Sequence, residues 1–293
     1  MGNPPGTLAQ PPGQPEKLVE VETLERISTG HQFTEGPLWH PSGYLLFSDI
    51  PGSRILRWEP GKEASVFREP SRNSNGLTFD RRGSLIACEH SARRVSRTLS
   101  DGTVEVVAET FMGKRLNSPN DVVVASDGRV YFTDPPYGLS SDSERELDFQ
   151  GVFCVTPDGE LHLGSRAMNR PNGLALSPDE TILYVADTVA MLVNAFPVSP
   201  DGTFGEPIVF SRLDGPGADG MKVDKEGNVY VTGPEGVWIW DREGNWVGLL
   251  KTPEQPANCA FGGEDGKTLF ITAKTSVYQV RTKVEGIRPG GWD

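Results

Sequence analysis

The chain of 293 residues contains only three cysteines and no long run of apolar residues. Cys88, Cys154 and Cys259 are widely spaced, lie in apolar strand-like segments and form no Cys-x-x-Cys pair. This pattern predicts buried, reduced thiols rather than a disulfide framework, which favours a cytoplasmic protein, or a periplasmic one if a signal segment was removed. No segment approaches the roughly 20 apolar residues that a membrane span requires, so no membrane partner is expected.

Basic residues are scarce relative to acidic ones. The sequence has 28 Lys and Arg against 40 Asp and Glu, a formal net charge of −12 at pH 7. A field of this sign repels phosphates, so we expect no nucleic acid as partner, whereas cations and small neutral molecules fit it. Residues 1–17, rich in Pro, Gly and Gln, lack the apolar segment of a signal peptide. We expect them to form a disordered tail before a single domain over residues 18–293, in a monomer or weak homo-oligomer.

Familiar catalytic signatures are also missing. The sequence has no G-x-S-x-G elbow, no H-E-x-x-H motif and no P-loop, and it contains only four histidines. His90 ends a strand-like segment, where it either lines the mouth of the channel or, as we expect, is simply solvated. Asp134 and Asp187 end strand-like segments too, and we expect them to make turn or inter-blade hydrogen bonds. A nucleophilic mechanism therefore has little support.

An internal repeat is what the sequence does contain. Its unit is a short apolar strand, a polar turn and a second strand that ends in a small or polar residue. The six first strands start 40, 45, 52, 47 and 39 residues apart, at Gly36, Gly76, Asp121, Gly173, Gly220 and Cys259. A period near 45 residues with several strands per unit is typical of propeller blades. The sequence therefore predicts an all-β, six-bladed β-propeller with four antiparallel strands per blade.

The last repeat leaves little chain for a fourth strand after residues 277–280. A strand-like segment, residues 18–27, lies before the first repeat. We expect this N-terminal strand to complete the sixth blade and close the ring, because closure removes the exposed edge of the sheet.

One polar position recurs directly before every first strand, eight residues ahead of the turn residue in each unit. The first strand of a blade lines the central channel, so these six side chains converge on the axis at one mouth. Asn and Asp also favour turns, but turn formation does not explain six amides and carboxylates out of six. The six residues, called the oxygen ring below, are Glu35, Asn75, Asn120, Asn172, Asp219 and Asn258.

Carboxylate and amide oxygens without Cys or His are hard ligands, which suit Ca²⁺ better than a tetrahedral zinc site. Glu35 and Asp219 supply two negative charges, enough to neutralise a divalent cation. We predict one divalent metal ion, Ca²⁺ foremost, with Zn, Mn, Mg or Fe as alternatives. Three or four of the six residues would contact it, and the others would face the substrate.

The motifs around the oxygen ring resemble the gluconolactonase/senescence-marker-protein (regucalcin-like) family over about residues 20–280. They read Glu35-Gly-Pro, Asn117-Ser-Pro-Asn-Asp121, Tyr131-Phe-Thr-Asp-Pro-Pro-Tyr-Gly138, Pro171-Asn-Gly-Leu174, Asp219-Gly-Met221 and Asn258-Cys-Ala-Phe-Gly-Gly263. Enzymes similar to diisopropyl fluorophosphatase and drug-responsive lactonases share this propeller. The resemblance implies a lactone hydrolase in which Asp219 is the candidate general base. It implies Glu35, Asn172, Asp219 and Asn120 as metal ligands.

Substrate contacts are expected from Asn120, Asn75 and Asn258, with Arg115 nearby. Relatives of the senescence-marker type carry an Arg two residues before the third-blade Asn to hold sugar hydroxyls, and Ser118 stands there in this sequence. Arg115 is close in the chain but out of register. The resemblance therefore implies a lactone substrate, foremost a sugar lactone such as gluconolactone, but the family's contact to sugar hydroxyls is not matched here.

In the expected reaction the metal polarises the lactone carbonyl, and a water activated by the metal with help from Asp219 attacks the carbonyl carbon. Two alternatives stay open: a phosphotriesterase-type hydrolase using the same site, and a non-catalytic calcium-binding propeller. Residues 137–150 form a charged, irregular insertion, which is either a lid over the pocket or a plain surface loop.

Overall fold

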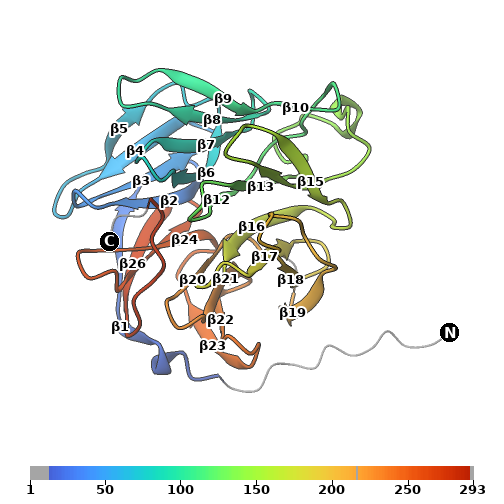
Figure 1. Cartoon of the computed structure of the whole chain (residues 1–293). Helices are drawn as coiled ribbons and strands as arrows, with labels where there is room; N and C mark the ends of the chain where they lie inside the picture. The colour runs from blue at the N-terminus through green and yellow to red at the C-terminus, as the bar shows by residue number, and fades with distance from the viewer. Residues whose placement is uncertain (1–12, 216, 291–293) are drawn as a thin grey trace.

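The computed structural model describes residues 13–215 and 217–290. Within them, six four-stranded antiparallel sheets surround a central channel (Figure 1). The six-bladed β-propeller predicted from the repeat is therefore confirmed. No helix among the described residues is long and apolar enough to cross a membrane.

Five blades run from the channel to the rim in chain order. The first consists of β2 (Thr34–His40), β3 (Tyr44–Asp49), β4 (Arg54–Trp58) and β5 (Ser65–Arg68). The second consists of β6 (Ser74–Phe79), β7 (Leu85–Glu89), β8 (Arg94–Thr98) and β9 (Val104–Ala108). The third consists of β12 (Val122–Val124), β13 (Val130–Asp134), β14 (Gly151–Val155) and β15 (Leu161–Ser165). A small hairpin, β10 (Thr110–Phe111) and β11 (Lys114–Arg115), precedes it.

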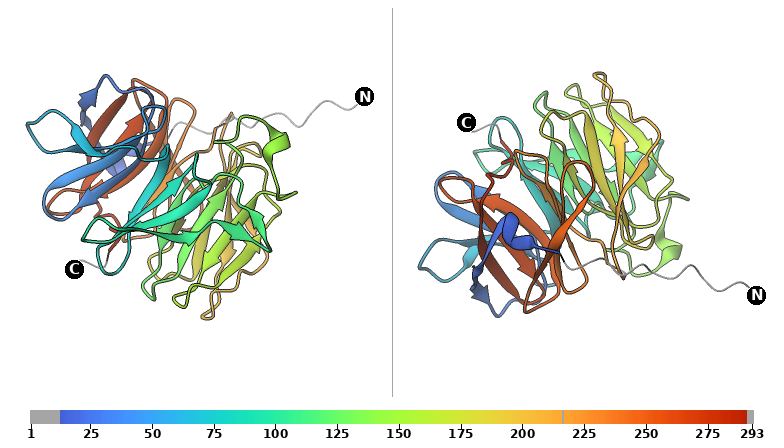
Figure 2. Two further views of the ribbon diagram at one scale, coloured as in Figure 1. Left: turned by 90° about the horizontal axis from the view of Figure 1, so that it is seen from above. Right: turned by 90° about the horizontal axis from the view of Figure 1, so that it is seen from below.

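The fourth blade consists of β16 (Pro171–Leu176), β17 (Ile182–Asp187), β18 (Leu192–Pro197) and β19 (Ile208–Arg212). The fifth consists of β20 (Met221–Val223), β21 (Val229–Gly233), β22 (Gly236–Trp240) and β23 (Trp246–Lys251). Figure 1 shows the blades fanned out around the axis, and Figure 2 shows the propeller from two opposite sides at right angles to that view.

Both ends of the chain contribute to the sixth blade. Its strands are β24 (Pro256–Gly262), β25 (Thr268–Ala273), β26 (Ser276–Thr282) and β1 (Val19–Thr29). β1 runs antiparallel to β26, with Val19 opposite Thr282 and Thr29 opposite Ser276, so the blue and red strands lie side by side in Figure 1. The expected closure of the ring by the N-terminal strand is confirmed.

Ordered structure begins earlier in the chain than the composition of the N-terminal segment indicates. Pro15–Lys17 form a short 3-10 helix, η1, and the Gln14 N–H donates to the Val247 carbonyl of β23 at 2.7 Å. The expectation of a disordered tail is therefore wrong for residues 13–17, because they pack against the fifth blade. Residues 1–12, the rest of that predicted tail, lie outside the described residues.

The core is a series of apolar layers between neighbouring blades. One layer joins Tyr184 of the fourth blade to Trp238 and Trp240 of the fifth. Cys88, Cys154 and Cys259 are free and buried, as the sequence predicts. The packed layers hold the six innermost strands in place, and these strands carry the site.

Candidate functional site

The structure brings the oxygen ring together at one mouth of the channel. Each member lies at or just before the start of an innermost strand, and these strands are neighbours around the axis. Five members are buried and Asp219 is partly buried. In four blades the pairing register shifts at this point, as between Glu35 and Leu38 in β2. An irregularity of this kind re-aims a side chain at a strand end.

Glycines beside the ring allow the innermost strands to approach each other closely. A Cβ on Gly36, whose φ is +51°, would lie 2.1 Å from the Asn75 carbonyl oxygen. A Cβ on Gly173 would lie 2.3 Å from the Asp219 carbonyl oxygen. Contacts this short admit no side chain, so glycine at these positions keeps the ring narrow.

Hydrogen bonds between blades hold the backbone of the ring. The Gly76 N–H donates to the Asn120 carbonyl at 2.8 Å. The Thr133 hydroxyl of β13 donates to the Asn172 carbonyl of the next blade at 2.8 Å. The small polar residue near the end of the second strand, noted in the repeat, thus positions the ring residue of the neighbouring blade.

The acidic residues that end second strands brace the loops before the ring. Asp134 accepts hydrogen bonds from the Asn117 and Ser118 N–H groups, both at 2.8 Å. Asp187 accepts from the Asn169 N–H at 2.9 Å. We expected turn or inter-blade hydrogen bonds for these two acids, and the observed bonds join each acid to the loop that enters its blade. Burial raises the pKa of Asp134 to about 7, although both N–H groups oppose the shift.

Three carboxylates lie close together around the ring. The Asn258 side-chain amide donates to Glu35 Oε2 at 3.0 Å and to Asp121 Oδ2 at 3.3 Å, so it bridges two acids. Burial, and then the Asp121 charge, raises the pKa of Glu35 to about 7. Burial, and then the charges of Glu35 and Asp121, raises the pKa of Asp219 well above its usual range. Such crowding of like charge disfavours ionisation unless a cation is near.

Two amide oxygens of the ring indicate what would relieve this crowding. Asn75 Oδ1 and Asn120 Oδ1 are buried and have no hydrogen-bond partner among the described residues. An unsatisfied buried oxygen costs about 1–3 kcal/mol, and it is also a suitable ligand for a hard cation. No group of three or more His, Cys, Asp or Glu among the described residues is arranged to hold a metal ion, and the amide oxygens of the ring are further oxygen ligands beside its acids. The residues present fit a hard divalent cation.

Sequence reasoning missed Asp121 and misjudged His90. Asp121 stands where four other blades have glycine, and this exception was the available signal. His90 is only 6% exposed, so the expectation that it is solvated is wrong. Burial lowers the pKa of His90 to about 4, and its Nε2 lies 3.4 Å from Asn75 Nδ2. A neutral imidazole therefore belongs to the wall of the site.

Tyr137 is a further wall residue, at the start of the insertion over residues 137–150. Burial is the largest influence on its raised pKa, and Asp219 and Asn172 are among the groups that act on it. The Arg170 guanidinium lies 5.2 Å from the centre of the Tyr137 ring. The Pro-Pro-Tyr-Gly motif was the signal that could have identified it.

The insertion itself is anchored at both ends beside the ring. The Gly138 N–H donates to the buried Ser118 hydroxyl at 2.9 Å, and the Asn117 side-chain amide donates to the Phe149 carbonyl at 3.0 Å. A one-turn 3-10 helix, η2 (Asp142–Glu144), lies between these anchors. Leu147 is buried in the core of the third blade.

Arg115 lies on the exposed hairpin strand β11, five residues before Asn120, and the hydrogen bonds that it makes with the described residues are not to the oxygen ring. Its N–H donates to Glu146 at 2.8 Å, and its guanidinium donates to the Ala92 carbonyl at 3.3 Å. Ser118, which stands where relatives carry an arginine, is fully buried and holds Gly138. A substrate contact from Arg115 stays a prediction.

Comparison with known proteins agrees with this geometry. Residues 33–275 match the family described as "SMP-30/Gluconolactonase/LRE-like region". The gluconolactonase of Zymomonas mobilis subsp. mobilis is 37% identical over 305 residues, an alignment that covers 92% of this chain and 85% of the relative.

Solved structures show the same likeness. A gluconolactonase from Xanthomonas campestris has a TM-score of 0.82 and 34% identity, covering 88% of this chain and 89% of its own. A calcium-binding protein, regucalcin, from Agrobacterium tumefaciens has a TM-score of 0.75 and 20% identity, covering 89% and 94%. At 20% identity, the likeness to the regucalcin structure concerns the fold alone.

Proposed function

The chain belongs to the SMP-30/gluconolactonase/LRE-like family and is a lactonase, and from this premise we propose that it opens sugar lactones at the oxygen ring with one divalent cation bound there. Gluconolactone is the first substrate to test, since gluconolactonases are among the similar proteins. Ca²⁺ is the first cation to test, since the ring offers only oxygen ligands and a structurally similar protein is calcium-binding.

A single observation supports the cation most strongly. The ring combines two acids of raised pKa, Glu35 and Asp219, with buried and unpartnered oxygens on Asn75 and Asn120. Each of these features is unfavourable in the protein alone. One hard cation relieves the crowding of the two acids and gives the Asn120 oxygen a partner, and a substrate hydroxyl would do so for Asn75. The residues proposed to hold it are Glu35, Asn120, Asn172 and Asp219.

The side chains of the ring divide the remaining tasks. When bound, a hard divalent cation supplies Lewis-acid polarisation of the lactone carbonyl. Asp219 assists by taking a proton from the water whose oxygen bonds to the carbonyl carbon. The C–O bond of the lactone then breaks between the carbonyl carbon and the leaving oxygen. The leaving oxygen takes up the proton, so lactone and water become a hydroxy acid. Asn75, Asn258 and Arg115 are the proposed contacts to substrate hydroxyls.

Initial rates of acid release test this proposal. The protein is stripped with chelator and then supplied with Ca²⁺, Zn²⁺, Mn²⁺, Mg²⁺ or Fe²⁺ singly, and each form is assayed on sugar and aliphatic lactones. We expect hydrolysis of a sugar lactone to disappear on stripping and to return with one cation. Unstripped protein with and without added cation controls for incomplete loading.

Two results would contradict the proposal in different ways. Hydrolysis that is unaffected by complete stripping would remove the cation from the reaction and leave the lactonase assignment intact. Organophosphate hydrolysis without any lactone hydrolysis would instead favour a phosphotriesterase-type reaction at the same site.

A further inference from the structure

One position recurs directly after the second strand of every blade. In the fourth blade this position is Thr188, which follows Asp187, and Asp187 pairs with Pro171 at the start of β16. The position therefore lies beside the ring residue of its own blade. Of the six residues found there, His90 and Thr188 have side chains that accept a hydrogen bond. The other four have side chains that accept none, and they are Ile50, Pro135, Pro234 and Lys274.

Both of these acceptors contact the side-chain amide of the ring Asn in their own blade. Asn172 Nδ2 donates to Thr188 Oγ1 at 3.2 Å, and Asn75 Nδ2 lies 3.4 Å from His90 Nε2. Because an amide nitrogen donates and does not accept, each ring amide turns its nitrogen to this position and its oxygen elsewhere. In the second blade that oxygen, Asn75 Oδ1, is buried and unpartnered among the described residues. The position after the second strand thus decides which amide atom is left for a ligand.

The hydrogen bonds of Thr188 permit one orientation of the Asn172 amide. The Thr188 hydroxyl has a single hydrogen, which it donates to the Ala218 carbonyl at 2.8 Å. A carbonyl oxygen only accepts, so toward Asn172 the hydroxyl oxygen must be the acceptor. If the amide were reversed, Asn172 Oδ1 would face Thr188 Oγ1 with no hydrogen between them. The amide nitrogen therefore belongs on the Thr188 side.

Thr188 also connects two neighbouring blades. Ala218 directly precedes Asp219, so one hydroxyl contacts the side chain of one proposed ligand, Asn172, and the backbone beside another. Hydrogen bonds from outer residues of this kind fix the orientation of metal ligands. We propose that Thr188 is a positioning residue of the oxygen ring, whose hydroxyl holds the Asn172 amide so that its oxygen is presented to the divalent cation. This inference rests on the cation of the proposed function.

Calcium titration calorimetry measures this role without relying on activity. Thr188→Val keeps the shape of the side chain and removes the hydroxyl, so the Asn172 amide can turn either way. We expect the variant to bind Ca²⁺ roughly tenfold more weakly than the wild type. Thr188→Ser restores the hydroxyl, and we expect its calcium affinity to lie within about threefold of the wild type.

A double-mutant cycle separates orientation of the amide from a general effect on the fold. Asn172→Asp replaces the amide by a carboxylate, whose two oxygens are equivalent, so no orientation has to be fixed. In that background Thr188→Val should change the calcium affinity by less than about twofold. The cycle compares the effect of Thr188→Val in the two backgrounds, because the added charge of Asn172→Asp changes the affinity by itself.

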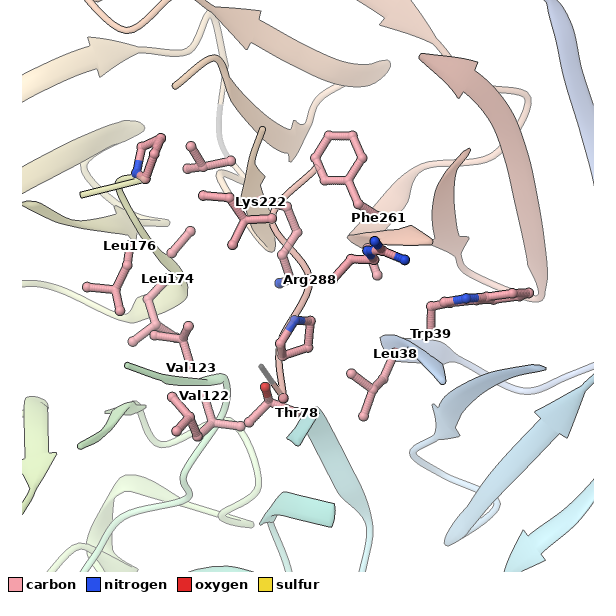
Figure 3. A pocket seen from close by; sticks show the side chains of 18 of the residues that line it. Leu38, Trp39, Thr78, Val122, Val123, Leu174, Leu176, Lys222, Phe261 and Arg288 are labelled. Carbon is pink, nitrogen blue, oxygen red and sulfur yellow. The ribbon is translucent and has the colours of Figure 1, made fainter. Parts of the chain in front are cut away.

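A control for lost stability comes from the same strand as Asn172. Leu176 ends β16 and lines a cavity of about 440 Å³ with other apolar side chains of the innermost strands (Figure 3). Thr188→Val loses the hydrogen bond to the Ala218 carbonyl, so its melting temperature in chelator should fall by about 5 °C. Leu176→Ala should lower the melting temperature at least as far, yet keep the calcium affinity within about twofold of the wild type.

The outcomes are distinguishable. Equal calcium affinity for Thr188→Val and the wild type would overturn the inference on Thr188 and leave the proposed function intact. A loss of the same size in the Asn172→Asp background would also overturn it, because the effect would then not act through the amide. If the wild type binds none of the divalent cations, the cation of the proposed function fails, and this inference fails with it. Circular dichroism checks that each variant is folded.

Discussion

At one end of the channel, the innermost strands present carboxylates and amides, whereas a few residues further along the same strands present Leu38, Leu77, Leu174 and Phe261. The polar end carries charges that crowd each other and oxygens that lack partners. The apolar end packs its side chains against neighbouring blades. The difference shows how one set of short strands separates reactivity from stability along a single axis.

This separation predicts that substitutions at the oxygen ring change the rate, while substitutions at the apolar end change the free energy of unfolding. Because the same innermost strands run through both ends, matched variants can be placed on one strand. The predictions below run from the largest expected effect to the smallest.

Replacing Asp219 should have the largest effect on the rate. Asp219→Asn removes a proposed ligand and proton acceptor, and we expect lactone hydrolysis to fall by about 10³-fold or more. Asp224→Asn is the matched control, because Asp224 is a buried acid five residues further along the same chain segment, where it binds the Asn228 N–H. Equal rates for Asp219→Asn and the wild type, measured as acid release with saturating cation, would contradict the separation.

Replacing Leu38 should show the reverse pattern. Leu38 is 2% exposed and packs in the cluster with Leu77 and Phe79. Leu38→Ala should lower the free energy of unfolding by about 2–3 kcal/mol, the lower part of the usual range because a cavity already adjoins the site. Urea unfolding measures the loss, and kcat at a temperature well below the transition should stay within about twofold of the wild type.

The raised pKa of Asp134 predicts a pH dependence at the oxygen-ring end. Because the folded state holds this proton up to a pH of about 7, against an ordinary value of 3.8, Asp134 makes the wild type lose stability as pH rises from about 4 to 7. Asp134→Asn removes this contribution, so the variant should gain stability relative to the wild type over that range, by about 1–2 kcal/mol.

Urea unfolding of both proteins at several pH values measures this difference. His90, whose pKa is lowered to about 4, acts in the opposite direction but equally in both proteins, so it cancels. A difference in stability that is constant across the range would show that Asp134 does not bind the proton.

A smaller effect is expected where a hydroxyl ties two blades together. The Thr232 Oγ1 donates to the Gly220 carbonyl at 3.0 Å and to the Ala257 carbonyl at 2.7 Å. Both carbonyls also accept backbone N–H groups, so neither is left unsatisfied in Thr232→Val. We expect a loss of about 1 kcal/mol in urea unfolding. A loss above about 3 kcal/mol would mean that the packing, and not only the hydrogen bond, had changed.

Arg115 should give the smallest effect. It is exposed, so Arg115→Ala should raise KM for a sugar lactone by about threefold and leave kcat unchanged. The adjacent exposed residue provides the control, Lys114→Ala, which should change neither constant. An unchanged KM in Arg115→Ala would remove Arg115 from the substrate contacts.

The sequence predicted the propeller and the oxygen ring because both recur six times, so weak local signals add up. It failed where a residue breaks the repeat or depends on tertiary contact. Asp121 departs from the glycine of four other blades, but its burial next to Asn258, which makes it part of the site, follows only from the closure of the ring. The burial of His90 and the packing of Gln14 against Val247 likewise depend on segments distant in the chain.

The pairing of β1 with β26 has a consequence for biosynthesis. β1 leaves the ribosome first, and its partner strand is made only after roughly 250 further residues, which takes on the order of 10–50 seconds. Throughout that interval β1 lacks its native partner strand. The η1 segment, which precedes β1 and packs on the fifth blade, is then not yet held in place by a complete sixth blade. A chaperone that captures extended segments would therefore find β1 available on the growing chain, and synthesis of β26 would set the earliest moment at which the circle can close.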